Sequence, residues 1–166
     1  MTMDTHVRRG HPITFGLIIL FGIIELAFSA WLTSEFNKHP EDRTLGQQDR
    51  VRFTLFASIW TVVFSALFFI LFMHSANGSV LTSVLSHLIF LALTWIIWTA
   101  AAVAVTQMIG GGLNCRLDEF VYCDQLNVLE AFAWLIWLLV TFATIVVIVR
   151  GISALRRGDG YRGGLV

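Results

Sequence analysis

Two cysteines are the residues of this chain whose spacing points most directly to chemistry. Cys115 and Cys123 are its only cysteines, and the segment Arg-Leu-Asp-Glu-Phe-Val-Tyr separates them. Two cysteines are too few for a disulfide-rich scaffold or for a structural zinc site, which takes four ligands. A redox role would need a Cys-x-x-Cys motif or a second cysteine pair, and the chain has neither. We therefore predict a structural disulfide in a loop just outside the membrane, with free thiols as the alternative.

Three ionisable side chains, Glu25, His87 and Glu130, lie within apolar segments of the chain. Charged groups are costly in hydrocarbon, so each is expected to have a function or a polar partner. For Glu25, near mid-bilayer, we expect a hydrogen bond to Ser, Thr or Trp of a neighbouring helix. A lipid-headgroup or ion contact and proton transfer are the alternatives. Glu130 is expected at the level of Arg50 and Arg52, where an interfacial salt bridge is the simplest interpretation.

His87 also raises the question of a haem. Intramembrane haem in a four-helix bundle usually takes two axial histidines on facing helices. No second histidine is expected opposite His87 at its depth. Glu25 is expected to differ from His87 in depth by about 9 Å at the helical rise per residue, which makes a direct pair uncertain. We predict no cofactor, no metal site and no catalytic residue.

Four tryptophans form the last candidate site. Trp95 and Trp98, and likewise Trp134 and Trp137, are paired three residues apart deep inside apolar segments. Interfacial belts normally hold tryptophan near the lipid headgroups. Packing between the two segments is the simplest interpretation, and a groove for a sterol or an acyl chain is the alternative.

These residues belong to a chain that is 57% hydrophobic and only 13% charged. The charged share is about half that of a soluble domain. A water-soluble domain of 166 residues could not bury so much apolar surface, so lipid must be the solvent for much of the chain. A formal net charge of zero argues against a nucleic-acid partner, because nucleic-acid binders carry a basic excess or stripe.

Four apolar runs predict the elements that position these residues. Each is near or above the roughly 20 residues that a spanning helix needs. The runs cover residues 13–32, 51–73, 80–109 and 128–149. The third is longer than about 25 residues, so it must tilt or extend beyond the hydrocarbon. A short turn at Asn77-Gly78 predicts that the second and third helices form a tight antiparallel hairpin, and Gly110-Gly111-Gly112 ends the third.

We therefore predict an all-α, four-helix transmembrane bundle with antiparallel up-down topology, in one domain over residues 1–166. Residues 1–11 and 151–166 are its short ends. With four spans, both ends share one side with the middle turn. Of the eleven Lys and Arg residues, six lie on that side and five on the other, so the positive-inside rule barely separates them. A disulfide requires an oxidising compartment, which places both ends in the cytosol.

The chain resembles the MARVEL-domain tetraspan proteins, in particular the small fungal members, from about Pro12 to Val166. The resemblance rests on the four-span plan with its short middle turn and on the first-helix segment Glu25-Leu-Ala-Phe-Ser-Ala-Trp-Leu. It rests equally on a loop cysteine followed by Leu129-Glu-Ala-Phe-Ala-Trp-Leu-Ile-Trp, and on a short tail after Arg150-Gly151.

The resemblance implies a non-enzymatic protein that organises membrane domains or trafficking through lipid binding and self-association. The implied partners are membrane lipids, a sterol among them, and either further copies of the chain or other membrane proteins. The implied location is the plasma membrane or an endomembrane. The alternative is a subunit of a channel or transporter, in which Glu25 and His87 line a polar intramembrane path.

Overall fold

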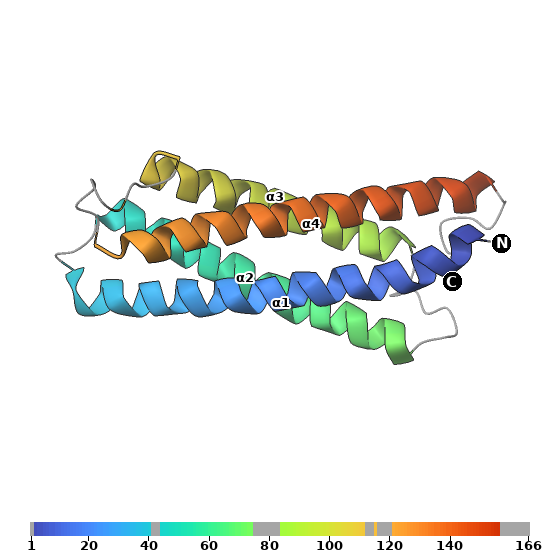
Figure 1. Ribbon diagram of the computed structural model, residues 1–166, viewed down its shortest axis with the longest axis horizontal. Helices are drawn as coiled ribbons and strands as arrows, with labels where there is room; N and C mark the ends of the chain where they lie inside the picture. Colours follow the sequence, from blue (N-terminus) through green and yellow to red (C-terminus); the bar gives the residue numbers. More distant parts are fainter. Residues whose placement is uncertain (1, 41–43, 75–83, 112–114, 116–120, 157–166) are drawn as a thin grey trace.

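Four α-helices make up the computed structural model, which describes residues 2–40, 44–74, 84–111, 115 and 121–156. The helices are α1 (Thr2–Lys38), α2 (Leu45–His74), α3 (Val84–Ile109) and α4 (Cys123–Arg156). They run alternately up and down, as Figure 1 shows, and no strand occurs among the described residues. The predicted all-α, four-helix architecture is confirmed.

Each helix contains a stretch that is long and apolar enough to cross a membrane. The stretches are Ile13–Lys38, Leu45–Ile70, Ser86–Ile109 and Cys123–Val149. At the helical rise per residue they measure about 36–40 Å, more than the roughly 30 Å of a hydrocarbon core. The helices extend beyond the apolar runs because a helix satisfies its own backbone hydrogen bonds and can continue into the polar headgroup layer.

The helices form a ring in which each lies next to its neighbours in the sequence and α4 closes against α1. The closest pairs are α1 with α2 and α3 with α4, whereas α2 and α3 share the smallest contact of the four. In Figure 1 the last turns of α2 lie apart from the first turns of α3. The prediction that α2 and α3 are antiparallel neighbours is confirmed, whereas the turn at Asn77-Gly78 that would make them a tight hairpin lies outside the described residues.

Side-chain size explains the difference between the two interfaces of α2. Against α1 it meets Gly22, where an added Cβ would lie only 3.0 Å from Cγ2 of Val62. Against α3 its end is held off by aromatic rings, with Phe68 lying 4.9 Å from Phe90 and 4.7 Å from His87 between ring centroids. Small residues let membrane helices approach closely, whereas the larger aromatic side chains at this end of α2 take up more space between the helices.

Glycines end α3, as the sequence predicts. Gly110 and Gly111 have φ angles of 76° and 92°, a left-handed conformation that costs glycine little. Their amides both donate to the carbonyl oxygen of Thr106, at 2.9 and 3.1 Å. This pattern satisfies a carbonyl that the last helical turn would leave without a partner.

Candidate functional site

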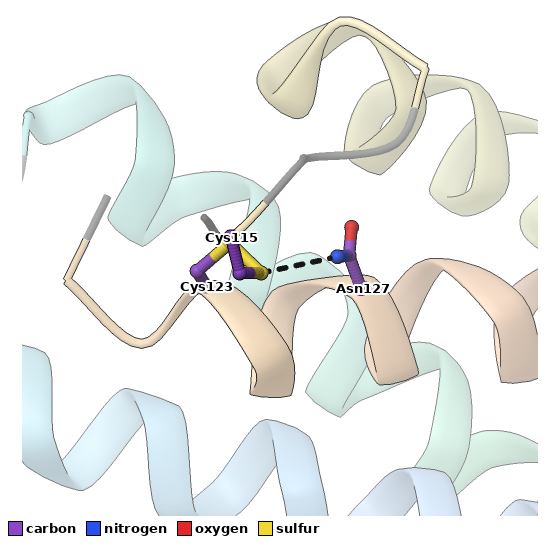
Figure 2. Close-up of a disulfide and its surroundings, with 3 residues drawn as sticks. All are labelled: Cys115, Cys123 and Asn127. Carbon is purple, nitrogen blue, oxygen red and sulfur yellow. Dashed lines mark hydrogen bonds between the residues drawn. A yellow bond between two sulfur atoms is a disulfide. The ribbon is translucent and has the colours of Figure 1, made fainter. Parts of the chain in front are cut away.

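The disulfide lies at the end of the bundle where α3 ends and α4 begins. Cys115 and Cys123 are bonded, with their Cα atoms 5.7 Å apart, so the structure contains the predicted bridge. Cys123 is the first residue of α4. One turn further along, the side-chain amide of Asn127 donates to Sγ of Cys115 at 3.4 Å, as Figure 2 shows. The bridge and this hydrogen bond therefore fix Cys115 onto the first turn of α4.

Removing the bridge is expected to lower the free energy of unfolding by about 2–3 kcal/mol, because a loop of this length then regains its entropy in the unfolded chain. The measurement is thermal unfolding in detergent, with and without reductant. The double variant Cys115→Ser/Cys123→Ser should unfold at the temperature of the reduced wild type and should not respond to reductant. A wild type insensitive to reductant would contradict the assignment, provided that thiol labelling proves the bridge was reduced.

Tyr122 precedes the bridge in an unusual backbone conformation. Its φ angle is 65°, the one left-handed non-glycine residue in the described part of the chain. That conformation costs an L-residue roughly 1–2 kcal/mol. The ring is held by edge contacts to Trp31 and Phe36 of α1, at centroid distances of 5.3 and 6.0 Å. These ring contacts hold the start of α4 against α1.

Beside this aromatic cluster, α1 and α4 form a groove. It is lined by Ala27, Phe28 and Trp31 of α1 and by Gln125 of α4, with a volume of about 310 Å³. Trp31 is 41% exposed. This volume is at the small end of the range for small-molecule sites, roughly 300–1,000 Å³. The groove combines apolar walls with one amide group.

The depth of the groove is set by the ends of the spans. Trp31 lies seven residues before Lys38, where the first span ends, and Gln125 lies two residues after Cys123, where the last begins. At the helical rise these positions lie about 3–10 Å inside the ends of the spans. This is the region in which lipid headgroups meet the acyl chains, where tryptophan and tyrosine are enriched.

Sequence reasoning missed this groove. Alanine, phenylalanine and tryptophan are ordinary residues of a membrane span, and their joint exposure depends on how α1 and α4 are rotated. The one signal was the interfacial position of Trp31, which alone is typical of an aromatic belt.

The four tryptophans predicted as a candidate site lie elsewhere, between α3 and its neighbours. Trp98 is fully buried, and its Nε1 donates to Oγ1 of Thr61 on α2 at 2.8 Å. The other three are half-buried and donate across the α3–α4 interface: Trp95 to Thr141, Trp134 to Thr106 and Trp137 to Thr99, at 2.8–2.9 Å. These contacts fit helix packing, and an acyl-chain groove at these residues stays a prediction.

Glu25 lies in the centre of the bundle and is fully buried. Neither of its carboxyl oxygens has a hydrogen-bond partner in the part of the chain that the structure describes. The expected bond to a Ser, Thr or Trp of a neighbouring helix is therefore not formed. The reason is local, since hydroxyls nearby donate to helix backbone: Ser29 to the main-chain oxygen of Glu25 at 2.7 Å, and Ser58 to that of Thr54 at 2.9 Å.

His87 lies near the other end of the bundle interior. It is buried, with its ring 6.1 Å from that of Phe15 on α1 and 4.7 Å from that of Phe68 on α2. Phe15 and Glu25 are ten residues apart on α1, which corresponds to about 15 Å of depth. The structure therefore separates Glu25 from His87 by more than the expected 9 Å.

The expected salt bridge between Glu130 and Arg50 or Arg52 is not formed. Nη1 of Arg50 instead donates to the carbonyl oxygen of Ala104 on α3 at 3.2 Å. Nη2 of Arg52 donates to Oδ1 of Asn37 on α1 at 3.0 Å. Glu130 lies on α4, which is diagonal to α2 in the ring.

No group of three or more His, Cys, Asp or Glu side chains is placed to hold a metal ion within the described ranges. Against known proteins, residues 6–146 match the family model for MARVEL, described as a membrane-associating domain. No curated protein and no solved structure matches the chain. The matched segment includes the residues of the groove, the disulfide and the buried glutamate.

Proposed function

The chain belongs to the MARVEL family of membrane-associating domains, and from this we propose that it is a non-enzymatic protein that organises its surrounding membrane by binding lipid. The observation that carries the proposal is the groove formed by Ala27, Phe28, Trp31 and Gln125. It is an apolar hollow with one polar group, at the depth of the lipid headgroups.

The chemistry of the groove favours a ligand with an apolar body and a small polar head. The aromatic side chains of Phe28 and Trp31 offer flat apolar surface. The amide of Gln125 can donate and accept hydrogen bonds. A sterol hydroxyl and the ester of a phospholipid both fit this description.

The rest of the membrane-facing surface carries large apolar side chains on all four helices, among them Ile23, Phe56, Ile96 and Phe142. Such a surface contacts any acyl chain, so preference for one lipid requires a hollowed site. Because the groove is open, a lipid held in it would remain accessible to a neighbouring protein. Self-association and contact with other membrane proteins are therefore part of the same proposal.

The orientation of the chain is also proposed. Figure 1 places the first turn of α1 and the last turn of α4 at the same end of the bundle. The disulfide at the opposite end requires an oxidising compartment, which favours cytosolic termini in the plasma membrane or an endomembrane. A glycan on Asn77, which begins an Asn-Gly-Ser sequon, would contradict this orientation.

The groove is tested by photolabelling the protein in lipid nanodiscs. One preparation contains a photoactivatable sterol and the other a phospholipid with a photoactivatable acyl chain. We expect labelled peptides that include Trp31 or Gln125. Trp31→Ala should reduce labelling severalfold, whereas Phe142→Ala should leave it unchanged. Phe142 is a fair control because it is 56% exposed on α4 but outside the groove.

The two probes also identify the source of the ligand. Labelling by the sterol alone indicates a sterol site, and labelling by the phospholipid alone indicates an acyl-chain site. Equal labelling along all four helices would mean that the groove has no preference, which contradicts the proposal. Labelling confined to Trp95 and Trp137 would move lipid binding to the tryptophan cluster.

A further inference from the structure

The buried polar side chains of the described residues are unevenly distributed among the helices. They are Glu25, Ser29, Gln48, Thr54, Ser58, Thr61, Ser65, His87 and Thr94, from α1, α2 and α3. The buried side chains of α4 are apolar throughout, from Leu126 to Val147. We call the polar set the polar column. It lies opposite α4 in the interior of the bundle.

The helix contacts order this column through the membrane. At the disulfide end, Nε2 of Gln48 donates to Oδ1 of Asn37 at 2.6 Å. At the other end, His87 packs against Phe15. From Phe15 to Asn37, α1 rises by about 33 Å, close to the thickness of a hydrocarbon core. Glu25 is near the middle of this distance.

The groups around Glu25 offer hydrogen-bond acceptors rather than donors. Gly22, one turn away, meets Thr61 and Val62 of α2, so Ser58 lies near the level of Glu25. The hydroxyl of Ser58 donates to the backbone oxygen of Thr54 at 2.9 Å. A hydroxyl that donates in this way still has lone pairs to accept with. These surroundings suit a carboxyl group that carries a proton and give a carboxylate nothing to accept from.

Among the residues that the structure describes, no cation from the neighbouring helices faces the carboxyl. Arg50 and Arg52 of α2 bind the backbone of α3 and Asn37, and His87 of α3 lies about 15 Å deeper along the bundle. On α4, Glu130 is at nearly the depth of Glu25. It lies one turn from Trp134, which bonds to Thr106 and so marks the side facing α3.

We propose that Glu25 is a proton-binding site that exchanges its proton with water at the disulfide end of the bundle. Ser29, Thr54 and Gln48 are the buried polar side chains between Glu25 and that end. The proton leaves the carboxyl oxygen for water and returns from it, so no other reactant is needed. The site does not depend on the lipid groove, which lies on the outer face of α1 and α4.

Toward the end of the bundle opposite the disulfide, a tryptophan separates Glu25 from water. Oγ1 of Thr61 donates to Ala57 and accepts from Nε1 of Trp98 at 2.8 Å, so it is engaged in both roles. Trp98 is the largest fully buried side chain among the described residues. Glu25 therefore communicates with one side of the membrane, and it is a proton-binding site rather than one step of a path across the bilayer.

Infrared spectroscopy of the protein in nanodiscs tests the site. The wild type should show the carbonyl stretch of a protonated carboxyl group, which should be absent from Glu25→Gln and retained in Glu130→Gln. On transfer to D₂O the band should shift as the proton is replaced by deuterium. A wild-type spectrum identical to that of Glu25→Gln, or a band that does not shift, would overturn the proposal.

The direction of exchange is tested by removing one hydroxyl on each side of Glu25. Thr54→Val should slow the deuterium shift severalfold, and Ser65→Ala should leave its rate unchanged. Both positions are buried on α2, and thermal unfolding checks that both variants are folded. If Thr54→Val does not fold, Ser58→Ala takes its place. Slowing by Ser65→Ala alone would place the route on the opposite side and contradict the proposed direction.

Discussion

Trp98→Ala is expected to lower the free energy of unfolding by about 3–5 kcal/mol, the usual cost of truncating a buried aromatic side chain. The side chain is fully buried where α3 meets α2, and its Nε1 bond to Thr61 is lost with it. Lipid cannot reach the cavity that alanine would leave. The measurement is equilibrium unfolding in mixed micelles of increasing denaturing detergent, followed by circular dichroism.

Ile96→Ala is the matched control for this prediction. Ile96 lies on the same helix, but it is 59% exposed and faces the membrane. Surface substitutions usually change stability by less than about 0.5 kcal/mol. Trp98→Phe adds a second comparison, because it keeps an aromatic ring and removes only the Nε1 donor. Equal losses for Trp98→Ala and Ile96→Ala would show that Trp98 is not a core residue.

Gly22→Ile is expected to lower the free energy of unfolding by about 1–3 kcal/mol, the typical cost of overpacking. An added Cβ at this position already lies 3.0 Å from Cγ2 of Val62 and 3.8 Å from Cγ2 of Thr61. A full isoleucine side chain must therefore push α1 away from α2. The same unfolding measurement checks the result.

Gly16→Ile provides the control on the same helix. An added Cβ at Gly16 meets nothing within 4 Å. Both substitutions change the helix propensity by the same amount, so their difference isolates the contact with α2. If the two variants lose equal stability, the close approach of α1 and α2 at Gly22 is contradicted.

Much of the fold could be predicted from the sequence for a simple physical reason. In lipid every backbone polar group must be satisfied within the chain, so a long apolar run specifies a spanning helix by its length alone. Gly110 and Gly111 similarly specified the end of α3. The extent of the α2–α3 contact could not be predicted, because it depends on how Phe68, Phe90 and His87 interlock.

Some features of the candidate site could likewise be predicted from the sequence, and others could not. Cys115 and Cys123 were predictable as a pair, because they are close in the sequence and no other cysteine competes. The partners of Glu25 and Glu130 were not predictable from depth alone. Depth does not say which helices are diagonal in the ring, or whether the hydroxyl of Ser58 already donates to its own backbone.

The lipid groove and the proton site are separate features of the bundle. The groove lies on the membrane-facing side of α1 and α4, whereas Glu25 faces the interior that α1 shares with α2 and α3. Variants at Trp31 should therefore leave the carboxyl band of Glu25 unchanged. This separation allows each proposal to fail without the other.

Lipid binding at the groove is tested most directly by the lipid that the protein retains through purification. Mass spectrometry should find a sterol or another membrane lipid in stoichiometric amount with the wild type. That lipid should be lost from Trp31→Ala and retained by Phe142→Ala. A protein that carries no stoichiometric lipid, that keeps the same lipid after Trp31→Ala, or that carries a quinone or haem instead, would contradict the account.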